Sequence, residues 1–420
     1  MKKTEKVAAW MAVTVALWGG WAWGAVGVTN VTVQQRYPWN GLVDIDYEVV
    51  CDDPEADVYV MPQGFDGDLG QVVPMANLSG DGVNAPVKAG KHRMTWDMGI
   101  GNKDFHSSAF SVKFTAISGV HQYLVVDMSE GLGGAYSMSW LDAVPDGGWT
   151  DEYKTTKLVM RLIMPGTFTM GSPEAETGRG SDEIQHVVTL TKPYYIGVFE
   201  VTQKQWELVV GTTPANYKGD ARPVERVRYG DIRGTGVGTN WPSNGKVNAG
   251  SFMGVLRAKT GLTFDLPTEA QWEYACRAGT TTMLNSGKNL TGTDKCANLA
   301  EVGRYTSNYS DAKGGYSQHT KVGSYLPNAW GLYDMHGNVW EFCLDWYGNY
   351  GTEEGMDPAG AGSGTFRVLR GGSWKESAKA CRSARRDNQR PDTTYRECSS
   401  YTSSASTYDV GFRLVCSAGP

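Results

Sequence analysis

A stretch rich in tryptophan and glycine constrains the fold of this chain more than any other part. It spans residues 328–347, reads NAWGLYDMHGNVWEFCLDWY, and holds three tryptophans and two glycines: Trp330, Gly331, Gly337, Trp340 and Trp346. Neither a helical period nor a strand alternation fits this pattern. The large rings need burial, and the glycines permit tight turns with positive φ between them. We therefore expect the stretch to form the irregular, buried centre of a larger domain.

The length and charge of the chain limit its organisation and its partners. Its 420 residues suffice for two or three domains, and its hydrophobic content of 40% suits sizeable cores. The formal net charge of −6 provides no basic footprint of the kind that nucleic acids attract. We therefore expect no nucleic-acid partner.

The N-terminus has the pattern of an export signal. Three lysines among the first six residues precede an apolar run over residues 7–18, and the small residues Ala22 and Gly24 follow it. This arrangement predicts a signal peptide at residues 1–24 and a secreted, periplasmic or cell-surface protein. An uncleaved membrane anchor is the alternative. No later apolar run is long enough to span a bilayer, so no other membrane contact is expected.

Residues 25–118 have the pattern of an all-β sandwich of the immunoglobulin or fibronectin kind. Apolar residues alternate with acidic ones over residues 43–49 and with polar ones over residues 110–116. A period of two indicates strands with one face on a core, and the length suits a small sandwich. The glycine-rich residues 119–156 predict a linker. A second domain is expected over residues 157–417.

Three helices are expected in the second domain because their capping residues are recognisable. Two capping boxes occur, Thr202 with Gln205 and Thr268 with Gln271. They predict helices that end at Val210 and at Arg277. A third helix is expected over residues 251–260, with Gly261 at its C-terminal end. Glycine-rich irregular chain follows, which is typical of an α+β domain with few regular elements.

A motif at residues 367–374, RVLRGGSW, completes a set that resembles a known family. In order along the chain, the set is PGTFTMGS, FEVTQKQW, LPTEAQWEYACRAG, NAWGLYDMHGNVWEF, RVLRGGSW and VGFRLV. Together these motifs resemble the sulfatase-modifying-factor domain, which has the fold of formylglycine-generating enzyme, a variant of the C-type-lectin fold. The resemblance implies an irregular, loop-rich α+β domain preceded by the all-β sandwich. It is specific for the fold and much less specific for an activity.

The resemblance also implies candidate catalytic residues. In formylglycine-generating enzyme, two cysteines after the GGS-aromatic motif bind copper(I), which prefers thiolates, and a cysteine of a sulfatase is oxidised. Counting from Trp374 places Glu376 and Cys381 at these positions. An alignment on the arginines of CRSARR instead makes Cys381 a structural cysteine, and in both alignments the copper pair is broken. Ser373 and Trp340 match further residues of the enzyme, and their alternative role is to hold the fold.

A disulfide between Cys276 and Cys381 is implied by the same resemblance. The chain has seven cysteines, so at least one stays unpaired within the chain. Export permits disulfides, and this one would join the helix that ends at Arg277 to the segment after GGSW. Two buried free thiols are the alternative.

Calcium is the cofactor that the resemblance implies, and copper is expected only if the protein is an oxidase. The first calcium site would use two carboxylates and two backbone carbonyls: Asp334, Glu341, Gly337 and Val339. Calcium prefers such mixed oxygen ligands. The alternative is that the carboxylates only cap backbone amides. A second site would use Asn298 and the carbonyl of Leu299, with Asp311 as a displaced acidic partner.

A polar segment near the C-terminus is the candidate binding surface. Between Trp374 and Val410 the chain has no Val, Ile, Leu, Met or Phe, so most of it is expected to be exposed. Tyrosine and arginine dominate binding hot spots. The candidate ligand-binding residues are Trp374, Arg382, Arg385, Arg396, Tyr401 and Tyr408. A solvated loop without a partner is the alternative.

Two functions remain open from the sequence. The first is an exported binding or structural module whose partner is an extracellular protein or an anionic glycan, because arginine favours acidic groups. The second is an oxidase that converts a cysteine of a sulfatase to formylglycine. The missing thiolate favours the first.

Overall fold

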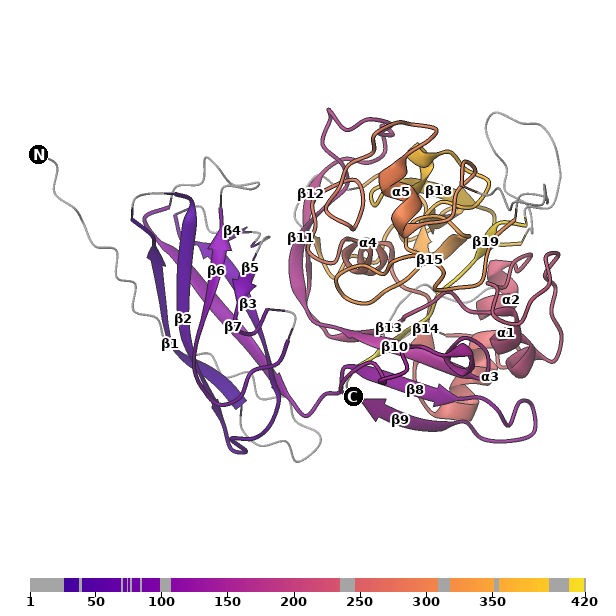
Figure 1. Cartoon of the computed structure of the whole chain (residues 1–420), viewed down its shortest axis with the longest axis horizontal. Coiled ribbons are helices and arrows are strands. Elements are labelled where there is room, and N and C mark those ends of the chain that lie inside the picture. The colour runs from indigo at the N-terminus through magenta and orange to yellow at the C-terminus, as the bar shows by residue number, and fades with distance from the viewer. Residues whose placement is uncertain are drawn as a thin grey trace, which may run out of the picture.

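The chain forms a β-sandwich and a larger, loop-rich α+β unit, which lie side by side (Figure 1). The structure, a computed structural model, describes residues 26–37, 40–68, 71–73, 75, 78–83, 85–98, 107–234, 246–308, 318–350, 355–392 and 408–418. The expected signal peptide at residues 1–24 lies outside these ranges. Within them, no helix has the length and apolar character that a membrane crossing requires.

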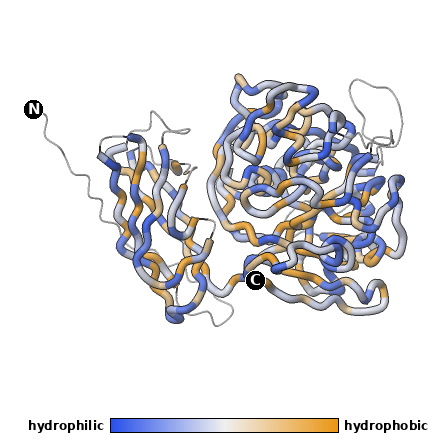
Figure 2. The backbone as a smooth tube through the Cα atoms, in the orientation of Figure 1, coloured by the Kyte–Doolittle hydropathy of each residue, from blue (hydrophilic) through white to orange (hydrophobic). Residues whose placement is uncertain are grey.

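The sandwich consists of two antiparallel sheets, with strand orders β1-β2-β6-β5 and β4-β3-β7. Its strands are β1 (Val26–Gln35), β2 (Leu42–Cys51), β3 (Val58–Asp66), β4 (Gln71–Val73), β5 (Leu78–Gly80), β6 (Gly90–Asp97) and β7 (Phe110–Ser118). The predicted alternation in β2 is confirmed, because Val43, Ile45, Tyr47 and Val49 are all buried between the sheets. The tube in Figure 2 shows this alternation of hydrophilic and hydrophobic residues along the strands.

The larger unit contains three sheets, five α-helices and two short 3-10 helices among its described residues. The first sheet is β14 (Phe264–Asp265), β20 (Val415–Ser417), β13 (Tyr194–Gly197), β10 (Lys157–Ile163), β8 (Tyr123–Asp127) and β9 (Ser137–Leu141); the second is β11 (Gly166–Met170), β12 (His186–Leu190) and β16 (Gly355–Met356); the third is β18 (Arg386–Gln389), β17 (Arg367–Arg370), β15 (Trp340–Trp346) and β19 (Val410–Gly411). The helices are α1 (Gln203–Val210), α2 (Tyr229–Arg233), α3 (Phe252–Thr260), α4 (Glu269–Arg277), α5 (Ala297–Val302), η1 (Asp151–Lys154) and η2 (Ala378–Cys381).

Residues 119–156 were predicted to form a linker, and this prediction is corrected. The segment contributes two strands, β8 and β9, to the first sheet of the larger unit. β8 pairs antiparallel with β10, and β9 pairs antiparallel with β8. Leu124 and Val126 pack into one core cluster, and Tyr123 and Val125 pack into another on the opposite face. Because β8 is buried on both faces, it has no polar alternation that would reveal it in the sequence.

The three predicted helices are confirmed as α1, α3 and α4. Both capping boxes form as expected, with the hydroxyls of Thr202 and Thr268 accepting from the third residue of each helix. Gly261 ends α3 in the left-handed conformation, with φ 71°. The short helices α2 and α5 were not predicted from the sequence.

The tryptophan-rich stretch is irregular only in its first part. Gly331 and Gly337 have φ values of 78° and 90°, as expected for turn glycines. The stretch then becomes β15, which was not expected. Phe342 and Cys343 face two different core clusters, and the polar face of the strand is buried too, with Glu341 and Asp345 beside Cys343. Trp340 is fully buried.

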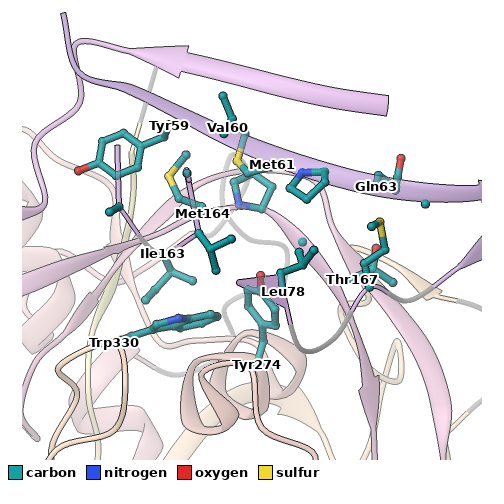
Figure 3. A pocket seen from close by; sticks show the side chains of 18 of the residues that line it. Tyr59, Val60, Met61, Gln63, Leu78, Ile163, Met164, Thr167, Tyr274 and Trp330 are labelled. Carbon is teal, nitrogen blue, oxygen red and sulfur yellow. The ribbon is translucent and has the colours of Figure 1, made fainter. Parts of the chain in front are cut away.

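The two units meet where β3 of the sandwich approaches the turn between β10 and β11. Figure 3 shows side chains of β3, such as Met61, facing Met164 of that turn and Trp330 of the larger unit. A cavity lies between these walls.

We predict that Gly337→Ala is far more destabilising than Gly287→Ala. Both glycines have positive φ, 90° and 76°, so an alanine at either position costs roughly 1–2 kcal/mol in backbone strain. A Cβ on Gly337 would also lie 2.0 Å from the carbonyl oxygen of Arg304, whereas a Cβ on Gly287 meets nothing within 4 Å. The clash should add roughly 1–3 kcal/mol or more. Equal losses in urea unfolding would contradict this packing.

Candidate functional site

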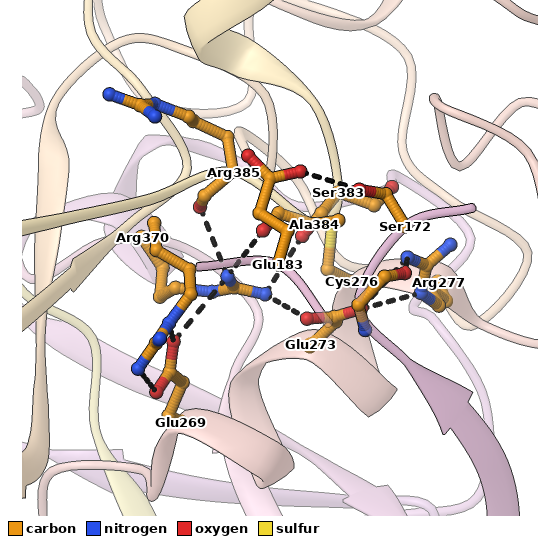
Figure 4. A network of polar contacts seen from close by, with 12 residues as sticks. Ser172, Glu183, Glu269, Glu273, Cys276, Arg277, Arg370, Ser383, Ala384 and Arg385 are labelled. Carbon is orange, nitrogen blue, oxygen red and sulfur yellow. Dashed lines mark hydrogen bonds and ion pairs between the residues drawn. The ribbon is translucent and has the colours of Figure 1, made fainter. Parts of the chain in front are cut away.

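Two glutamates of α4 anchor a buried network of arginines (Figure 4). Arg386 donates to both carboxylate oxygens of Glu269, at 2.7 and 2.9 Å. Arg370 donates to Glu273 and, at 3.0 Å, to the carbonyl of Arg385. The paired guanidiniums and carboxylates are buried. The network therefore joins α4 to β17 and β18, and so to the segment after GGSW.

Two more buried arginines extend this arrangement. Arg382 holds both oxygens of Glu183 at 2.8 Å, and Arg413 holds both oxygens of Glu341 at 2.6 Å. All four side chains are fully buried. Removing one partner of a buried pair leaves an uncompensated charge, which typically costs about 3–5 kcal/mol. These pairs therefore act mainly as structural supports.

The expectation that the segment after Trp374 is mostly exposed is wrong for its described part. Arg382 is fully buried and Trp374 is 4% exposed. The sequence could not show this, because the carboxylate that compensates Arg382 comes from Glu183, about two hundred residues earlier.

The other candidate binding residues have different surroundings. Arg385 is half-buried, and in Figure 4 its guanidinium points away from the network. Tyr408 is half-buried. Arg396 and Tyr401 lie outside the described residues, so the structure does not test them.

The three candidate catalytic residues are all buried. The Cys381 sulfur lies 4.0 Å from the carbonyl oxygen of Ser373, and a Cβ on Gly372 would lie only 2.6 Å from that sulfur. Burial raises the pKa of the Cys381 thiol far above its usual value, which disfavours the thiolate. Trp340 belongs to the main core cluster. A sealed, protonated thiol is poorly suited to copper(I), which binds thiolates.

The expected disulfide between Cys276 and Cys381 is not formed in the structure, because both residues are free thiols. This expectation is therefore corrected. Cys276 packs with the core cluster around Trp272, whereas Cys381 packs with the cluster around Leu284. The Cys276 sulfur lies 3.8 Å from the carbonyl of Met335. The sulfurs therefore serve as buried apolar groups in separate clusters.

The turn of the first expected calcium site has a strained backbone. Asp334 and Asn338 have φ values of 58° and 63°, in the left-handed region, on either side of Gly337. One Asp334 oxygen accepts from the amide of Gly323 at 2.6 Å, and the other has no hydrogen-bond partner among the described residues. Positive φ at non-glycine residues persists only where the surroundings enforce it, and it is frequent at ligand sites.

Buried negative charge is in excess around this turn. Burial and the neighbouring carboxylates of Asp334 and Glu341 raise the pKa of Glu200 well above its usual value, and burial raises the pKa of Asp334 to about 6. Arg413 pairs with Glu341 and is the cation of this group. No described cluster of three or more His, Cys, Asp or Glu side chains is arranged to hold a metal ion. Of the two expected carboxylates, Asp334 has an oxygen without a partner among the described residues, whereas both oxygens of Glu341 are held by Arg413. The charge excess fits a cation at Asp334, with the backbone carbonyls of Gly337 and Val339 as the other expected ligands.

The second expected calcium set has less support. The Asn298 amide nitrogen donates to the carbonyl of Asn289 at 2.7 Å, and the carbonyl of Leu299 accepts from Gly303 at the end of α5. Asp311 lies outside the described residues. The Leu299 carbonyl is thus already used within the fold, and the second set lacks a described carboxylate.

An aromatic group with two cations includes the residue after Ser373, and we call it the aromatic rim: Tyr217, Trp374, Tyr408, Arg226 and Lys375. The ring of Tyr217 is perpendicular to those of Trp374 and Tyr408, at 5.6 and 6.1 Å. Lys375 lies 5.4 Å from the Trp374 ring, and Arg226 lies 5.5 Å from the Tyr408 ring. Next to Trp374 and Tyr408 in the sequence, the Ser373 hydroxyl donates to Asp409 at 2.9 Å. Lys375 is exposed, and the rim can therefore meet an acidic ligand.

Sequence reasoning missed Tyr217 and Arg226. Arg226 has φ 62°, although no glycine marks the position. Beside the rim, His319 lies edge-on to Tyr217 at 5.7 Å and 3.7 Å from the carboxylate of Glu225. No motif or period in this part of the sequence connects it with Trp374, so only the fold brings these residues together.

The fold and the site define a domain of the sulfatase-modifying-factor class. The family model described as "Sulfatase-modifying factor enzyme 1-like domain" matches residues 150–418, and the chain belongs to this family. A protein of Paenibacillus barcinonensis named chaperone protein LppX is 32% identical over 219 residues, which are 45% of this chain and 72% of that protein. Formylglycine-generating enzyme of Streptomyces coelicolor is 40% identical over 142 residues, which are 31% of this chain and 43% of that enzyme.

Among solved structures, Treponema denticola variable protein 1 superposes with a TM-score of 0.46 and 27% sequence identity, covering 62% of this chain and 95% of that one. The chain spans less than half of the Streptomyces coelicolor enzyme. The activity of that enzyme is therefore not transferred to this chain by the match.

We predict that Asp345→Asn stabilises the protein increasingly as the pH rises from 5 to 8. Asp345 is buried beside Glu269, and burial raises the pKa of its carboxyl to about 7. Because the folded pKa exceeds the unfolded one, the stability from protonation is present at low pH and is lost as the pH rises through about 7. Asparagine stays neutral and can still accept the 2.7 Å bond from the Glu269 amide.

At pH 8 the melting temperature of the variant should exceed that of the wild type by roughly 5 °C. This shift corresponds to a stability gain of roughly 2 kcal/mol, since 1 kcal/mol shifts the melting temperature by about 2–4 °C in a domain of this size. The exposed substitution Glu174→Gln is the control and should leave the pH profile unchanged. Parallel pH profiles for Asp345→Asn and the wild type would show that this carboxyl is not perturbed.

Proposed function

We propose that this protein is an exported binding member of the sulfatase-modifying-factor family that does not make formylglycine. The observation that carries the proposal is the sealed Cys381 thiol, which is fully buried, packed against Gly372 and has a strongly raised pKa. Glu376 stands at the position where the resemblance expects the second thiolate. A hard carboxylate is a poor replacement for a soft copper(I) ligand.

The oxidase remains the second candidate, because a stretch of the chain is 40% identical to a protein named formylglycine-generating enzyme.

We predict that purified protein incubated with copper(I), oxygen and a cysteine-containing sulfatase peptide forms no formylglycine detectable by mass spectrometry. Copper(I) affinity should be the same for the wild type and for Cys381→Ser, since the buried thiol does not contribute. Formylglycine that forms with the wild type and disappears with Cys381→Ser would establish the oxidase instead.

The aromatic rim supports a binding function. Two cations, Arg226 and Lys375, lie over rings that are themselves fixed by packing and by the 3.2 Å bond from the Trp374 indole to the Tyr408 carbonyl. Rigid aromatic groups lose little entropy on binding, and cations beside them favour acidic groups. We therefore propose a partner that presents acidic groups, on an extracellular protein or an anionic glycan. Residues 1–24 support this placement, since their pattern is that of an export signal.

The predicted test is a screen of the full-length protein on an array of sulfated and carboxylated glycans and on extracellular proteins. Lys375→Ala and Arg226→Ala should each weaken the selected interaction roughly tenfold, the usual worth of a charge-assisted hydrogen bond. Lys192→Ala removes an exposed lysine elsewhere and should change nothing. Binding that survives both rim substitutions would refute the assignment of the rim. Binding that is weakened by Lys192→Ala instead would refute it as well.

We also propose that calcium binds the turn at Asp334. The support is the excess of buried carboxylates around Glu200 and the Asp334 oxygen without a partner among described residues. Asp334 would hold the ion with the backbone carbonyls of Gly337 and Val339, and the ion would supply positive charge and rigidity to the turn. Glu341, the other expected carboxylate, is paired with Arg413 through both of its oxygens and would contribute only nearby negative charge.

We predict that the melting temperature at pH 7.5 is higher with calcium than with chelator, and that Asp334→Asn abolishes this difference. In chelator, the same variant should melt above the wild type. The reason is that the pKa of Asp334 is raised to about 6, so the stability of the calcium-free protein falls as the pH rises towards that value. Magnesium, which requires a tighter geometry, is the control ion. Identical wild-type melting curves in calcium and chelator would rule out the site.

A further inference from the structure

We propose that the cavity between the sandwich and the larger unit binds an uncharged, apolar molecule about the size of one small aromatic ring system. The cavity has a volume of about 160 Å³ and lies where β3 meets the turn between β10 and β11 (Figure 3). A void of about 150 Å³ is sufficient for a benzene-sized ligand.

The walls of the cavity carry no charge. None of the described residues that line it is Asp, Glu, Lys, Arg or His. Three methionines contribute to the walls, Met61 and Met75 from the sandwich and Met164 from the larger unit. Methionine adapts its shape to a ligand and contacts aromatic rings favourably. An ion finds no charged partner in these walls, so the chemistry favours a neutral ligand.

Aromatic rings form the opposite wall. Tyr274 and Trp330 lie perpendicular to each other at 4.9 Å, and Phe168 packs on Tyr274 at 5.1 Å. Figure 3 shows Tyr274 and Trp330 projecting towards the methionines across the cavity. A planar ring between thioethers and aromatic edges would make the offset and edge contacts that such groups prefer. An aromatic ligand therefore fits this wall better than a branched aliphatic one.

The position of the cavity gives the ligand a consequence for the whole chain. One wall belongs to the sandwich and the other to the larger unit. A molecule that contacts both walls binds only the docked arrangement and stabilises it by mass action. The site is separate from the aromatic rim and from Cys381, so it is independent of the proposed function.

Indole is a suitable probe, and the full-length protein is labelled with ¹³C-methyl methionine. On titration with indole, the methyl signals of Met61, Met75 and Met164 should shift with one common affinity, after assignment by single Met→Leu substitutions. The exposed Met356 and the core Met253 should not move. The melting temperature should rise with indole concentration.

Val83→Phe, which places a larger side chain in the lining, should weaken indole binding about tenfold or more, and Leu78→Phe provides an independent filling variant. Val50→Phe adds the same ring at an exposed sandwich position and is the matched control. Saturable shifts that vanish only in the filling variants establish the site. Absent shifts up to the solubility of indole, or shifts that both filling variants leave unchanged, overturn it.

Discussion

The larger unit depends on buried pairs between arginine and glutamate. Four such pairs join segments that are distant in the sequence. They are Glu269 with Arg386, Glu273 with Arg370, Glu341 with Arg413, and Glu183 with Arg382. The regular elements of this unit are short and are joined by long irregular segments, so its backbone needs other constraints. A buried charge can be tolerated only beside its partner, and each pair therefore fixes the relative position of two distant segments.

The same pairs determine what the segment after GGSW can do. Arg370, Arg382 and Arg386 bracket Ser373 and Cys381, and their carboxylate partners hold this part of the chain against α4 and the loop after β11. The scaffold thereby buries the sulfur instead of presenting it. The rim offers more accessible groups, since Lys375 is exposed and Tyr217, Arg226 and Tyr408 are half-buried. A member of the family could therefore lack catalysis and still keep both the fold and this network of arginine and glutamate pairs.

Sequence reasoning recovered what is local and missed what is distant. The helices α1, α3 and α4 were predictable because a capping box involves residues three positions apart. β8 was missed because both of its faces are buried and apolar, so its sequence lacks alternation. β15 does alternate, from Trp340 to Trp346, but its acidic face is buried against arginines that are distant in the sequence, and the glycine-rich turn before it hid the pattern. The burial of Arg382 was missed because its partner Glu183 is remote in the sequence. The expected disulfide failed for a similar reason, since only the fold shows that Cys276 and Cys381 belong to different clusters.

The acidic turn and the rim are joined by the backbone. The amide of Trp374 donates to the carbonyl of Asn338 at 3.0 Å, and the amide of Gly337 donates to the carbonyl of Gly371 at 2.8 Å. Asn338 in turn donates to Glu200, one of the carboxylates in excess. A cation that relieves the repulsion at Asp334 would therefore also fix the residue that supports Trp374. Because a rigid aromatic anchor binds with a smaller entropy loss than a mobile one, charge balance in the turn should influence affinity at the rim without any direct contact between the cation and the ligand.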